Sequence, residues 1–457
     1  MVKARPRVGI AGLGYMGLAT GLGFAQRGLR VQGFEIRSEV RRELRKGRTT
    51  FHEPDLPSLL RTHVENGRFS VVDDWTTLVE ASDVIFLCLP TPRRPDGRID
   101  LRPLMKGVDQ LGRALKERDR RLLVVVKSTV VPGTTEGIVR PRLEGTTGRG
   151  DRDLGVAANP EFLAEGSMVR DVLFPERIVV GVSSERDGSL LGEVYRGFRA
   201  PLLVLSPTGA ELVKYASNAY LAMKVTFANE LSRISERAGV DVDEVTRAVG
   251  LDSRIGPKFL GAGPGFGGSC FEKDVRALVV RAHELGVRPR VLESLVPSNE
   301  DQTAHAYSLV RSIVGPVRGR SLAVLGLAFK AGTDDVRETR ALPLVARAAR
   351  DGALVRVHDP VALVKFRDLW LKERRSSAGR VRFCSTVTEA LDGADAAILH
   401  SPWPEYLSFP RDWTARMRTP IVIDLRRALP GSVRRRSDLR WVGLGTATAR
   451  REQRRVR

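Results

Sequence analysis

Cysteine is scarce in this sequence. Its 457 residues include only three cysteines, Cys88, Cys270 and Cys384. Three thiols cannot build a disulfide framework, and no two of them have the spacing of metal ligands, so no metal site is expected. The cysteine content fits a protein that works in a reducing compartment.

Long apolar runs are also missing. No uninterrupted apolar segment reaches the roughly 18 residues that are needed to cross a bilayer. The run from Val8 to Ala25 follows basic residues, as a signal-peptide core does, but it contains six glycines in eighteen positions. A stretch so rich in glycine makes a poor signal core and a good turn, so we expect a cytoplasmic protein without membrane association.

Acidic residues are in deficit. Lysine and arginine total 75 against 54 for aspartate and glutamate, which gives a net charge of +21. Such an excess can serve nucleic acid, an anionic surface or small anionic ligands. Here it is spread widely and clusters only near the C-terminus, in "VRRRSDLRW" and "RREQRRVR". We interpret these segments as a fraying basic tail and expect no nucleic-acid partner.

The N-terminal segment predicts a dinucleotide-binding turn. A β-branched strand leads into Gly12, Gly14 and Gly17, whose G-x-G-x-x-G spacing permits a tight turn, a close approach to a pyrophosphate, and helix-on-strand packing. A helical pattern and a second strand, "RVQGFE", follow, and Glu35 lies at the end of that strand. Its carboxylate can bind ribose hydroxyls and repel a 2′-phosphate, which favours NAD, while the nearby Arg37 keeps NADP as the alternative.

The remaining pattern divides the chain into three parts. Strands are predicted at "ASDVIFLCLPTP" and "RLLVVVKSTVVPG". They place Thr91 and Thr129 at the carboxyl ends of strands, where each threonine can bind a ligand or serve as a helix N-cap. From about Ser206 to Asn299 the pattern is helical. Strands return at "SLAVLG", "LVRVHDP", "ADAAILHSPW" and "PIVIDLRRAL". The order is therefore α/β, helical connector, α/β.

A helix predicted from Ser206 to Lys224 carries Lys214 and Asn218 four residues apart, on one face of a helix that is otherwise largely apolar. A lysine that extends to solvent beside a capping amide would account for the pair without any function. The alternative is that both side chains belong to a site.

A second glycine-rich segment, "GAGPGFGGSCFEKDV", surrounds Cys270. Glycines let backbone amides converge on a ligand, and Lys273 would favour the thiolate, so Cys270 is a candidate nucleophile. Cys88 and Cys384 are better explained by packing. A nicotinamide cofactor combined with a nucleophilic thiol indicates oxidation through a thiohemiacetal to a thioester, which takes the substrate up two oxidation levels.

Seven motifs together resemble those of the UDP-glucose/GDP-mannose dehydrogenase family. They are "GLGYMG", "LPTP", "KSTVVPGTTE", "NPEFLAEGSMVRDVLFPERIVVG", "ELVKYASNAYLAMKVTFANE", "RIGPKFLGAGPGFGGSCFEKDV" and "GLAFKAGTDDVRET". The resemblance covers roughly residues 5 to 430. It implies an α/β fold of two Rossmann-like doubly wound domains joined by a central helical dimerisation region, with boundaries at 1–205, 206–300, 301–430 and a basic tail at 431–457.

The resemblance also implies a reaction, a four-electron oxidation of a nucleotide sugar at C6 by two NAD+ in turn. We expect UDP-glucose to be the substrate and UDP-glucuronate the product. The alternatives are GDP-mannose or a UDP-N-acetylhexosamine, although "GGSC" argues against the branch with histidine before cysteine. An inactive basic nucleotide- or RNA-binding scaffold would leave Cys270, Lys214 and Asn218 unexplained.

Residue roles are carried over from the matching motifs. Cys270 is the implied nucleophile, and Asp274 positions water or takes a proton. Lys214 and Asn218 stabilise the oxygen that becomes negative, while Glu161 assists thioester hydrolysis and Thr129 holds water or the nicotinamide side. The cofactor-binding residues implied are Gly12, Gly14, Tyr15, Met16, Gly17, Glu35, Thr91, Thr129, Glu165, Lys273 and Arg337. The substrate-binding residues implied are Glu161, Phe162, Leu163, Lys214, Asn218, Arg254, Phe259, Leu260, Gly261, Gly263, Gly267, Lys330 and Arg426.

Some of these assignments carry further expectations. Arg427 is an equal candidate for the role of Arg426. Arg254 resembles an arginine that reaches the sugar site of a partner subunit, so a homodimer or a higher homo-oligomer is expected. Glu272 stands where many relatives carry proline, which predicts a less constrained turn after Cys270. The tail beyond about residue 430 matches no motif.

Overall fold

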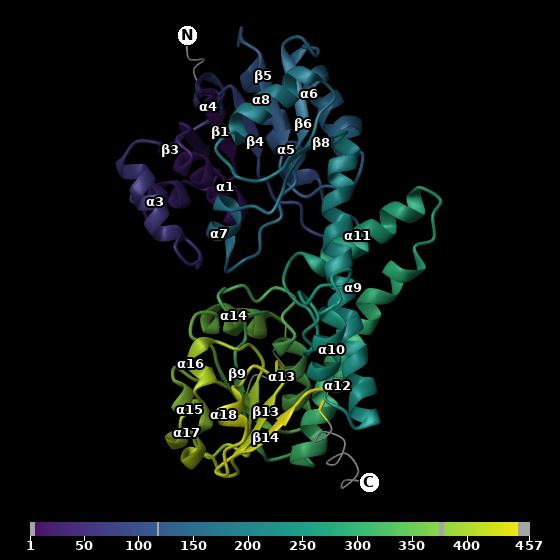
Figure 1. Cartoon of the computed structure of the whole chain (residues 1–457). Coiled ribbons are helices and arrows are strands. Elements are labelled where there is room, and N and C mark those ends of the chain that lie inside the picture. Colours follow the sequence, from purple (N-terminus) through teal and green to yellow (C-terminus); the bar gives the residue numbers. More distant parts are fainter. Residues whose placement is uncertain (1–4, 117, 374–378, 447–457) are drawn as a thin grey trace. The chain divides into compact units, whose positions relative to one another are not determined.

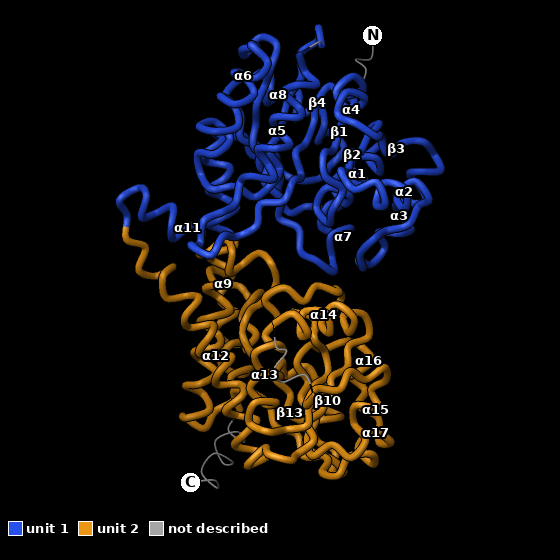
Figure 2. The backbone as a smooth tube through the Cα atoms, turned by 180° about the vertical axis from the view of Figure 1, so that it is seen from behind, with its two compact units in different colours: residues 1–217, 277–287 blue, residues 218–276, 288–457 orange. Residues whose placement is uncertain are grey.

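The computed structural model describes residues 5–116, 118–373 and 379–446 (Figure 1). These residues form two compact units: unit 1 comprises residues 1–217 and 277–287, and unit 2 comprises residues 218–276 and 288–457 (Figure 2). The chain passes from unit 1 to unit 2 within one helix, α9 (Pro207–Ala238), and α11 (Phe271–Glu284) likewise belongs partly to each. Each unit is described below by itself.

Unit 1 is built on a sheet whose described strands run in the order β3-β2-β1-β4-β5-β6-β7-β8. The strands are β1 (Val8–Ala11), β2 (Val31–Phe34), β3 (Phe69–Val72), β4 (Val84–Leu87), β5 (Leu122–Val126), β6 (Leu154–Ala158), β7 (Ile178–Gly181) and β8 (Leu202–Leu205). All neighbours pair in parallel except β6 and β7, which meet antiparallel at one residue pair. The first six strands have the order of a doubly wound sheet, in which the ligand crevice lies where the strand order reverses, beside β1 and β4.

Helices cover both faces of this sheet, because alternate residues of each central strand point to opposite sides. In β5, Leu123 and Val125 join the core on one face, whereas Leu122, Val124 and Val126 join the core on the other. The helices are α1 (Tyr15–Gln26), α2 (Ser38–Arg45), α3 (Leu56–Glu65), α4 (Trp75–Ala81), α5 (Arg102–Leu115), the π-helical turn η1 (Thr135–Val139), α6 (Arg140–Thr147), α7 (Met168–Leu173) and α8 (Glu185–Tyr195).

Unit 2 repeats the same strand order in a second, wholly parallel sheet, β11-β10-β9-β12-β13-β14. Its described strands are β9 (Ser321–Leu325), β10 (Leu354–His358), β11 (Val381–Phe383), β12 (Ala396–Leu399), β13 (Ile421–Asp424) and β14 (Arg440–Gly443). The helices of this part of the chain are α10 (Val242–Gly250), α12 (Arg290–Val314), α13 (Ala341–Arg350), α14 (Leu363–Glu373), α15 (Val387–Leu391), α16 (Pro404–Leu407), α17 (Arg411–Arg416) and α18 (Gly431–Arg434).

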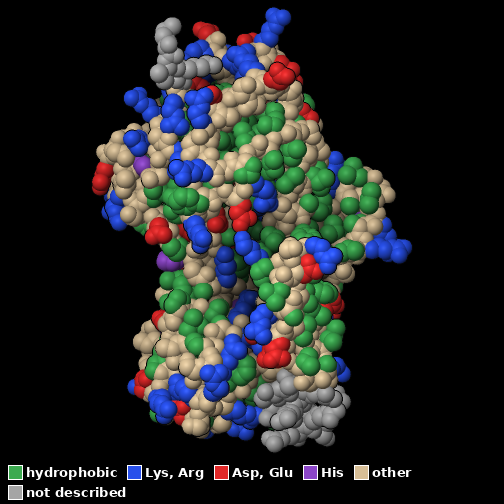
Figure 3. All heavy atoms as spheres, viewed as in Figure 1, with side chains coloured by type: hydrophobic (Ala, Val, Ile, Leu, Met, Phe, Trp, Pro, Cys, Tyr) green, Lys and Arg blue, Asp and Glu red, His purple; other side chains and the backbone are tan. Residues whose placement is uncertain are grey.

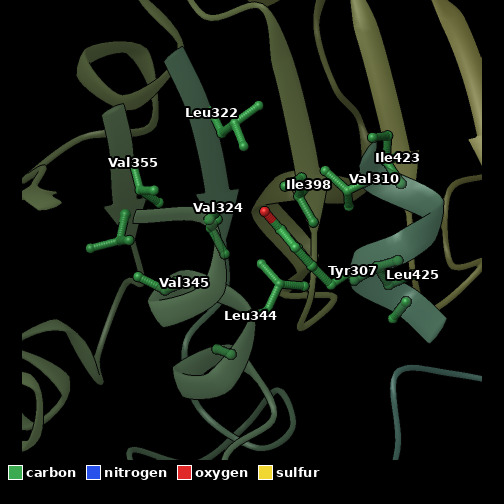
Figure 4. Packing of buried hydrophobic residues seen from close by; sticks show 14 of the residues in the cluster. Tyr307, Val310, Leu322, Val324, Leu344, Val345, Val355, Ile398, Ile423 and Leu425 are labelled. Atoms are coloured by element: carbon green, nitrogen blue, oxygen red, sulfur yellow. The ribbon is translucent and has the colours of Figure 1, made fainter. Parts of the chain in front are cut away.

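The core of unit 2 alternates in the same way. Leu322 and Val324 of β9 pack with Tyr307 of α12 and Leu344 of α13 on one face of the sheet (Figure 4). Ala323 and Leu325 pack on the other face, in a separate cluster. Two doubly wound parallel sheets are therefore present, which confirms the predicted fold class.

The strands predicted from the sequence are found, at β1, β2, β4, β5, β9, β10, β12 and β13. The segment from Ser206 to Asn299 contains helices only among its regular elements, α9 to α11 and the start of α12. Strands β3, β6, β7, β8, β11 and β14 did not stand out in the sequence. Most of them are four residues long or shorter, as several of the predicted strands are, so length alone does not explain why they were missed.

The interpretation of the C-terminus as a fraying tail from residue 431 is wrong as far as Thr446. This stretch forms α18 and β14, and β14 pairs in parallel with β13 from Ile421↔Arg440 to Asp424↔Gly443. Val442 and Leu444 are fully buried in the unit 2 core. Apolar burial at alternate positions fixes this segment although arginines surround it. Residues 447–457, which include "RREQRRVR", lie outside the described residues.

Two other global properties concern charge and the membrane. Figure 3 shows Lys and Arg side chains spread over both units rather than gathered on one of them. Of the helices described, none combines the length and the apolar character that a bilayer span requires.

The folded C-terminus gives a first prediction. Leu444→Ala removes a fully buried side chain from the core of unit 2, so we expect it to lower the free energy of unfolding by about 2–5 kcal/mol. Leu371→Ala, at an exposed leucine of α14, is the control and should change it by no more than about 0.5 kcal/mol. Urea unfolding of the full chain, followed by circular dichroism, measures both. Equal stability of Leu444→Ala and wild type would mean that residues 440–446 do not belong to the fold.

Candidate active site

The first glycine turn forms a cradle at the carboxyl end of β1. Gly12 has φ +93° and a Cβ there would lie 2.5 Å from the carbonyl oxygen of Cys88, so only glycine fits. A Cβ on Gly17 would overlap the carbonyl oxygen of Gly12. Gly14 is the N-cap of α1, and a Cβ at this position would meet open space. The first-turn amides of α1, at Tyr15, Met16 and Gly17, are thus arranged as a pyrophosphate site requires, and the residues fit NAD.

Glu35 lies directly after β2 and is buried. Its Oε2 accepts a hydrogen bond from the amide of Leu13 (3.2 Å) in the glycine turn, and its Oε1 accepts from Nε of Arg37 (3.0 Å). The Arg37 side chain is 57% exposed. The carboxylate is therefore held beside the turn where ribose hydroxyls are recognised in such folds, and Arg37 is tied to it.

The loops after β4 and β5 are joined to each other. Oγ1 of Thr91 donates to the carbonyl oxygen of Thr129 (2.8 Å), and Oγ of Ser128 donates to the carbonyl oxygens of Leu87 (3.1 Å) and Leu89 (2.7 Å). A cavity of about 10 Å³ beside this loop is lined by Thr129, Ser128, Pro160, Glu211 and Lys214, among others. That volume admits about one water molecule.

Lys214 does not extend to solvent, so the interpretation of this residue as a solvent-exposed lysine is wrong. The residue is 3% exposed, and its Nζ lies 2.7 Å from Oε1 of Glu161. Oε2 of Glu161 also accepts from the amide of Leu163 (2.5 Å). Burial raises the pKa of Glu161, but the Lys214 ammonium outweighs it and holds that pKa below its ordinary value. Phe162 lies under two cations, with Arg177 at 4.1 Å and Lys214 at 5.8 Å from its ring centre.

Two residues near this pair escaped the sequence analysis. Lys127 is buried and donates to Oδ1 of Asn159 (2.9 Å), and burial lowers its pKa to about 8. Glu211, one turn before Lys214 on α9, accepts from the amides of Gly133 (2.6 Å) and Thr135 (2.8 Å). The available signal was Lys127 at the end of an apolar strand and Glu211 on the apolar helix, since an ionisable residue in such a setting needs a partner.

Cys270 is the exposed thiol of the three and directly precedes α11. The amide of Asp274 donates to the carbonyl oxygen of Cys270 (2.9 Å), so the two residues are one helical turn apart. Oδ2 of Asp274 accepts from Nδ2 of Asn218 (2.6 Å), and Oδ1 pairs with Lys273. Unit 2 therefore brings Cys270, Asp274 and Asn218 into one neighbourhood.

The other two cysteines are buried, as expected for packing residues. Burial raises the pKa of Cys88 to about 12 and that of Cys384 to about 11. Neither is ionised at neutral pH, which leaves Cys270 as the candidate nucleophile.

The glycine-rich loop before Cys270 is held by polar side chains from two helices. Oδ1 of Asn229 accepts from the amide of Gly263 (2.9 Å), Nε2 of Gln302 donates to the carbonyl oxygen of Gly263 (2.8 Å), and Oγ1 of Thr303 donates to that of Pro264 (2.9 Å). Asn299 bonds both the amide (2.7 Å) and the carbonyl (3.0 Å) of Phe266. The sequence signal for these anchors was the spacing of Asn299, Gln302 and Thr303 on one face of a helix.

The other residues that were expected to bind substrate in this segment lie in or next to the glycine-rich loop before Cys270. Leu260 is buried, Phe259 is exposed with φ +66°, and a Cβ on Gly267 would lie 2.5 Å from the carbonyl oxygen of Glu338. Gly261 has open space at its Cβ position. The loop is thus closed on one side by residues 337–338 and open at Gly261.

Arg426 and Arg427 differ sharply in their surroundings. Arg427 is paired with Asp241 (2.5 Å) and Asp243 (2.7 Å). Arg426 is partly buried, packs against Gly263 and donates to the carbonyl oxygens of His400 (3.2 Å) and Phe329 (3.2 Å); desolvation of its guanidinium lowers its pKa to about 10. Within the described chain no carboxylate pairs with Arg426, so an anionic ligand would complete its environment.

The other expected binding residues are more exposed. Arg254 pairs with Asp252 (2.6 Å) at the surface of unit 2, Arg337 forms a two-pronged pair with Asp335 (2.6 and 2.9 Å), and Lys330 lies 5.6 Å above the Phe329 ring. In unit 1, Leu163 packs against the sheet core and Glu165 is partly buried in the loop before α7.

The Glu161–Lys214 pair gives a prediction with a defined sign. A carboxyl whose pKa is lowered by folding stabilises the fold above its ordinary value of 4.5, and that contribution is lost as the pH falls. In Lys214→Met, the main group that opposes burial is lost and only the Leu163 amide and the more distant Lys127 still favour the carboxylate, so the pKa of Glu161 rises and the stabilisation by its charged form shrinks. We expect the variant to be destabilised by about 3–5 kcal/mol at neutral pH and by less near pH 4.

Urea unfolding between about pH 4 and about pH 8 measures this difference. Lys106→Met, which removes an exposed lysine of α5, is the control and should follow the wild-type curve. A destabilisation of Lys214→Met that does not change with pH would contradict the pairing.

Comparison with known proteins matches this arrangement. Three domains of the UDP-glucose/GDP-mannose dehydrogenase family match the chain: the NAD binding domain at residues 6–199, the central domain at 208–301, and the UDP binding domain at 323–431. A UDP-glucose 6-dehydrogenase of Haloferax volcanii is 39% identical over 92% of this chain and 96% of its own length, and one of Bacillus subtilis is 35% identical over 92% and 89%.

Solved structures agree. A UDP-glucose dehydrogenase from Pyrobaculum islandicum superimposes with a TM-score of 0.89 at 38% identity, covering 98% of this chain and 99% of its own. A UDP-D-ManNAc dehydrogenase from Pyrococcus horikoshii gives 0.82 at 29% identity, covering 96% and 99%. The chain is an NAD-dependent nucleotide-sugar dehydrogenase and belongs to the UDP-glucose/GDP-mannose dehydrogenase family.

Proposed function

We propose that this enzyme oxidises UDP-glucose at C6 to UDP-glucuronate through a thioester on Cys270. The observation that carries the proposal is the placement of the exposed Cys270 at the start of α11, one turn before Asp274, which is bonded to Asn218. A reactive thiol beside a hydrogen-bonded acid is what a covalent oxidation needs, and a simple alcohol dehydrogenase does not. The names of the relatives support UDP-glucose as the sugar.

Cys270 acts on the aldehyde level of the substrate. NAD+, when bound, accepts a hydride from C6 at each of the two oxidations. Sγ of Cys270 adds to C6 of the aldehyde and forms a thiohemiacetal, whose oxidation gives the thioester. Water then adds to C6, the C–S bond breaks, and the thiolate and the acid are released. The carboxylate of Asp274 is the proton acceptor beside this sulfur, and a hydrogen bond from Asn218 holds that carboxylate in place.

Lys214 and Asn218 lie one turn apart on α9 and present an ammonium and an amide on the same helix face. These donors stabilise the oxygen at C6 when it becomes negative, during alcohol oxidation and during thioester hydrolysis. Glu161, kept ionised by Lys214, orients or deprotonates the hydrolytic water. The small cavity lined by Thr129 and Lys214 is a site where such a water can be held.

Basic residues of unit 2 would bind the nucleotide diphosphate. Arg426 is the better candidate of the adjacent pair, because Arg427 is already occupied by Asp241 and Asp243. Lys330 and the glycine loop, including Gly261, Gly263 and Gly267, would complete the substrate site, with Phe259 and Leu260 at its edge. Arg337 and Lys273 would contact the cofactor. We keep the domain boundaries at residues 1–205, 206–300 and 301–430 as functional divisions, and a reducing, cytoplasmic setting fits the free thiols.

The substrate and the covalent step are tested together. With UDP-glucose we expect close to two NADH per sugar, whereas GDP-mannose and UDP-N-acetylhexosamines should react far more slowly. Cys270→Ser should bind both ligands but lose acid formation by several orders of magnitude, because a serine hydroxyl ionises far less readily than a thiol.

Cys384→Ser, at a buried cysteine outside the proposed site, is the matched control and should keep the wild-type rate. One NADH per sugar, or rapid acid formation by Cys270→Ser, would rule out the covalent four-electron reaction. If another nucleotide sugar reacts faster and also yields two NADH, the covalent reaction stands and only the assignment of the substrate changes.

We also propose that the enzyme is a homodimer joined along α9. Tyr220, Phe227 and Ile234 are 54%, 49% and 61% exposed, and their spacing of seven places them in one stripe on the helix. An apolar stripe of this kind is suited to a second copy of the same helix. The exposed Arg254 is then available to a neighbouring subunit.

Phe227→Glu should place a charge in the stripe and shift the enzyme towards monomer, as measured by light scattering coupled to gel filtration. Val364→Glu, at an equally exposed apolar residue of α14, is the control and should leave the mass unchanged. An unchanged mass for Phe227→Glu, or a monomeric wild type, would exclude this interface.

A further inference from the structure

Glu272 is a buried acid in the first turn of α11, two residues after Cys270. Its Oε1 accepts from Nε of Arg276 (3.0 Å), and its Oε2 accepts from the guanidinium of Arg340 (2.9 Å). The expectation that this position, without proline, leaves the turn less constrained is therefore wrong. Two arginines hold the turn instead.

Arg340 is itself buried and uses its guanidinium in two directions. While one nitrogen pairs with Glu272, its Nε donates to the carbonyl oxygen of Phe266 (2.8 Å), in the glycine-rich loop on the other side of Cys270. A single side chain thus ties together the segments immediately before and after the cysteine. Arg340 lies directly before α13, so this link attaches the Cys270 loop to the nucleotide-binding sheet domain of unit 2.

We propose that Glu272 and Arg340 are a positioning pair that fixes Cys270 and balances the charge around it. The proposal rests on the assignment of Cys270 as the nucleophile. The role of the pair is to hold the backbone on both sides of the thiol, through Glu272 in α11 and through the link from Arg340 to Phe266.

Charge balance is the reason why the pair matters chemically. An unpaired carboxylate two residues from Cys270 would oppose formation of the thiolate. Burial raises the pKa of Glu272, but Arg276 and Arg340 outweigh it and keep the residue ionised, so its charge is matched by neighbouring cations. Other charged groups around the cysteine loop include Lys273 and Asp274 on α11, and Arg337 and Glu338 on the segment that closes the loop. Arg426 packs against Gly263, and Glu300 of α12 pairs with Arg276.

The test uses opposite changes at the two residues. Arg340→Gln removes a cation and the Phe266 link, so the apparent pKa for alkylation of Cys270 by iodoacetamide should rise. Glu272→Gln removes the carboxylate, so that apparent pKa should fall. Peptide mass spectrometry of the full enzyme, alkylated over a range of pH, reports the reaction of Cys270 specifically. For Arg340→Gln we expect kcat to fall at least about tenfold, with KM for sugar and NAD changed less than about threefold.

Arg276→Gln is the matched control. It removes the other cation from the same carboxylate but keeps the link to Phe266, so kcat should change no more than about twofold. The double variant Glu272→Gln/Arg340→Gln should lose no more activity than Arg340→Gln alone, because the two side chains act as one unit.

Several outcomes would overturn the proposal. These are unchanged kcat in Arg340→Gln, equal losses in Arg340→Gln and Arg276→Gln, additive losses in the double variant, or alkylation curves that do not move in opposite directions. If Arg340→Gln fails to fold, Glu272→Gln should still lower the apparent pKa of Cys270, and Arg340→Lys, which keeps the charge but not both bonds, should lower kcat without raising that pKa; unchanged kcat in Arg340→Lys would then contradict the proposal. Full activity of Cys270→Ala would instead reject the proposed function, whatever the arginine variants do.

Discussion

The structure depends on one continuous helix. α9 runs unbroken for 32 residues, and its pitch places Lys214 and Asn218 one turn apart on a single face. Lys214 forms an ion pair with Glu161 in unit 1, and Asn218 bonds Asp274 in unit 2. The pitch of α9 alone sets the spacing of these two side chains along the helix.

Buried charge is handled in the same way throughout the site. Glu161 is matched by Lys214, Glu272 by two arginines, and Asp274 by Lys273 and the amide of Asn218. Each pair removes the cost of burying a lone ion and fixes a side chain in one position. Arg426 differs from these groups, because its partly buried guanidinium bonds carbonyl oxygens and no described carboxylate pairs with it. A diphosphate would supply the negative charge that such a guanidinium favours.

The sequence predicted the features that have few physical solutions. The spacing of Gly12, Gly14 and Gly17 permits one kind of turn, and glycines around an exposed cysteine indicated the region of Cys270. Features that depend on contacts with residues far away in the sequence could not be predicted. Arg426 and Arg427 are identical neighbours whose roles differ only because Asp241 and Asp243 meet one of them. β14 is four residues long and begins with an arginine, and the partner of Glu272 is seen only once Arg340 is folded against it.

The central claim, a thioester on Cys270 that Glu161 helps to hydrolyse, is tested most directly by trapping it. Glu161→Gln should slow hydrolysis more than oxidation, so rapid acid quenching after mixing with UDP-glucose and NAD+ should preserve the adduct. Peptide mass spectrometry is then expected to find the nucleotide-linked uronyl group on the peptide that contains Cys270, and on no peptide of Cys270→Ser. Release of acid by Glu161→Gln with no adduct on Cys270 at any time, or an adduct on another residue, would contradict the account.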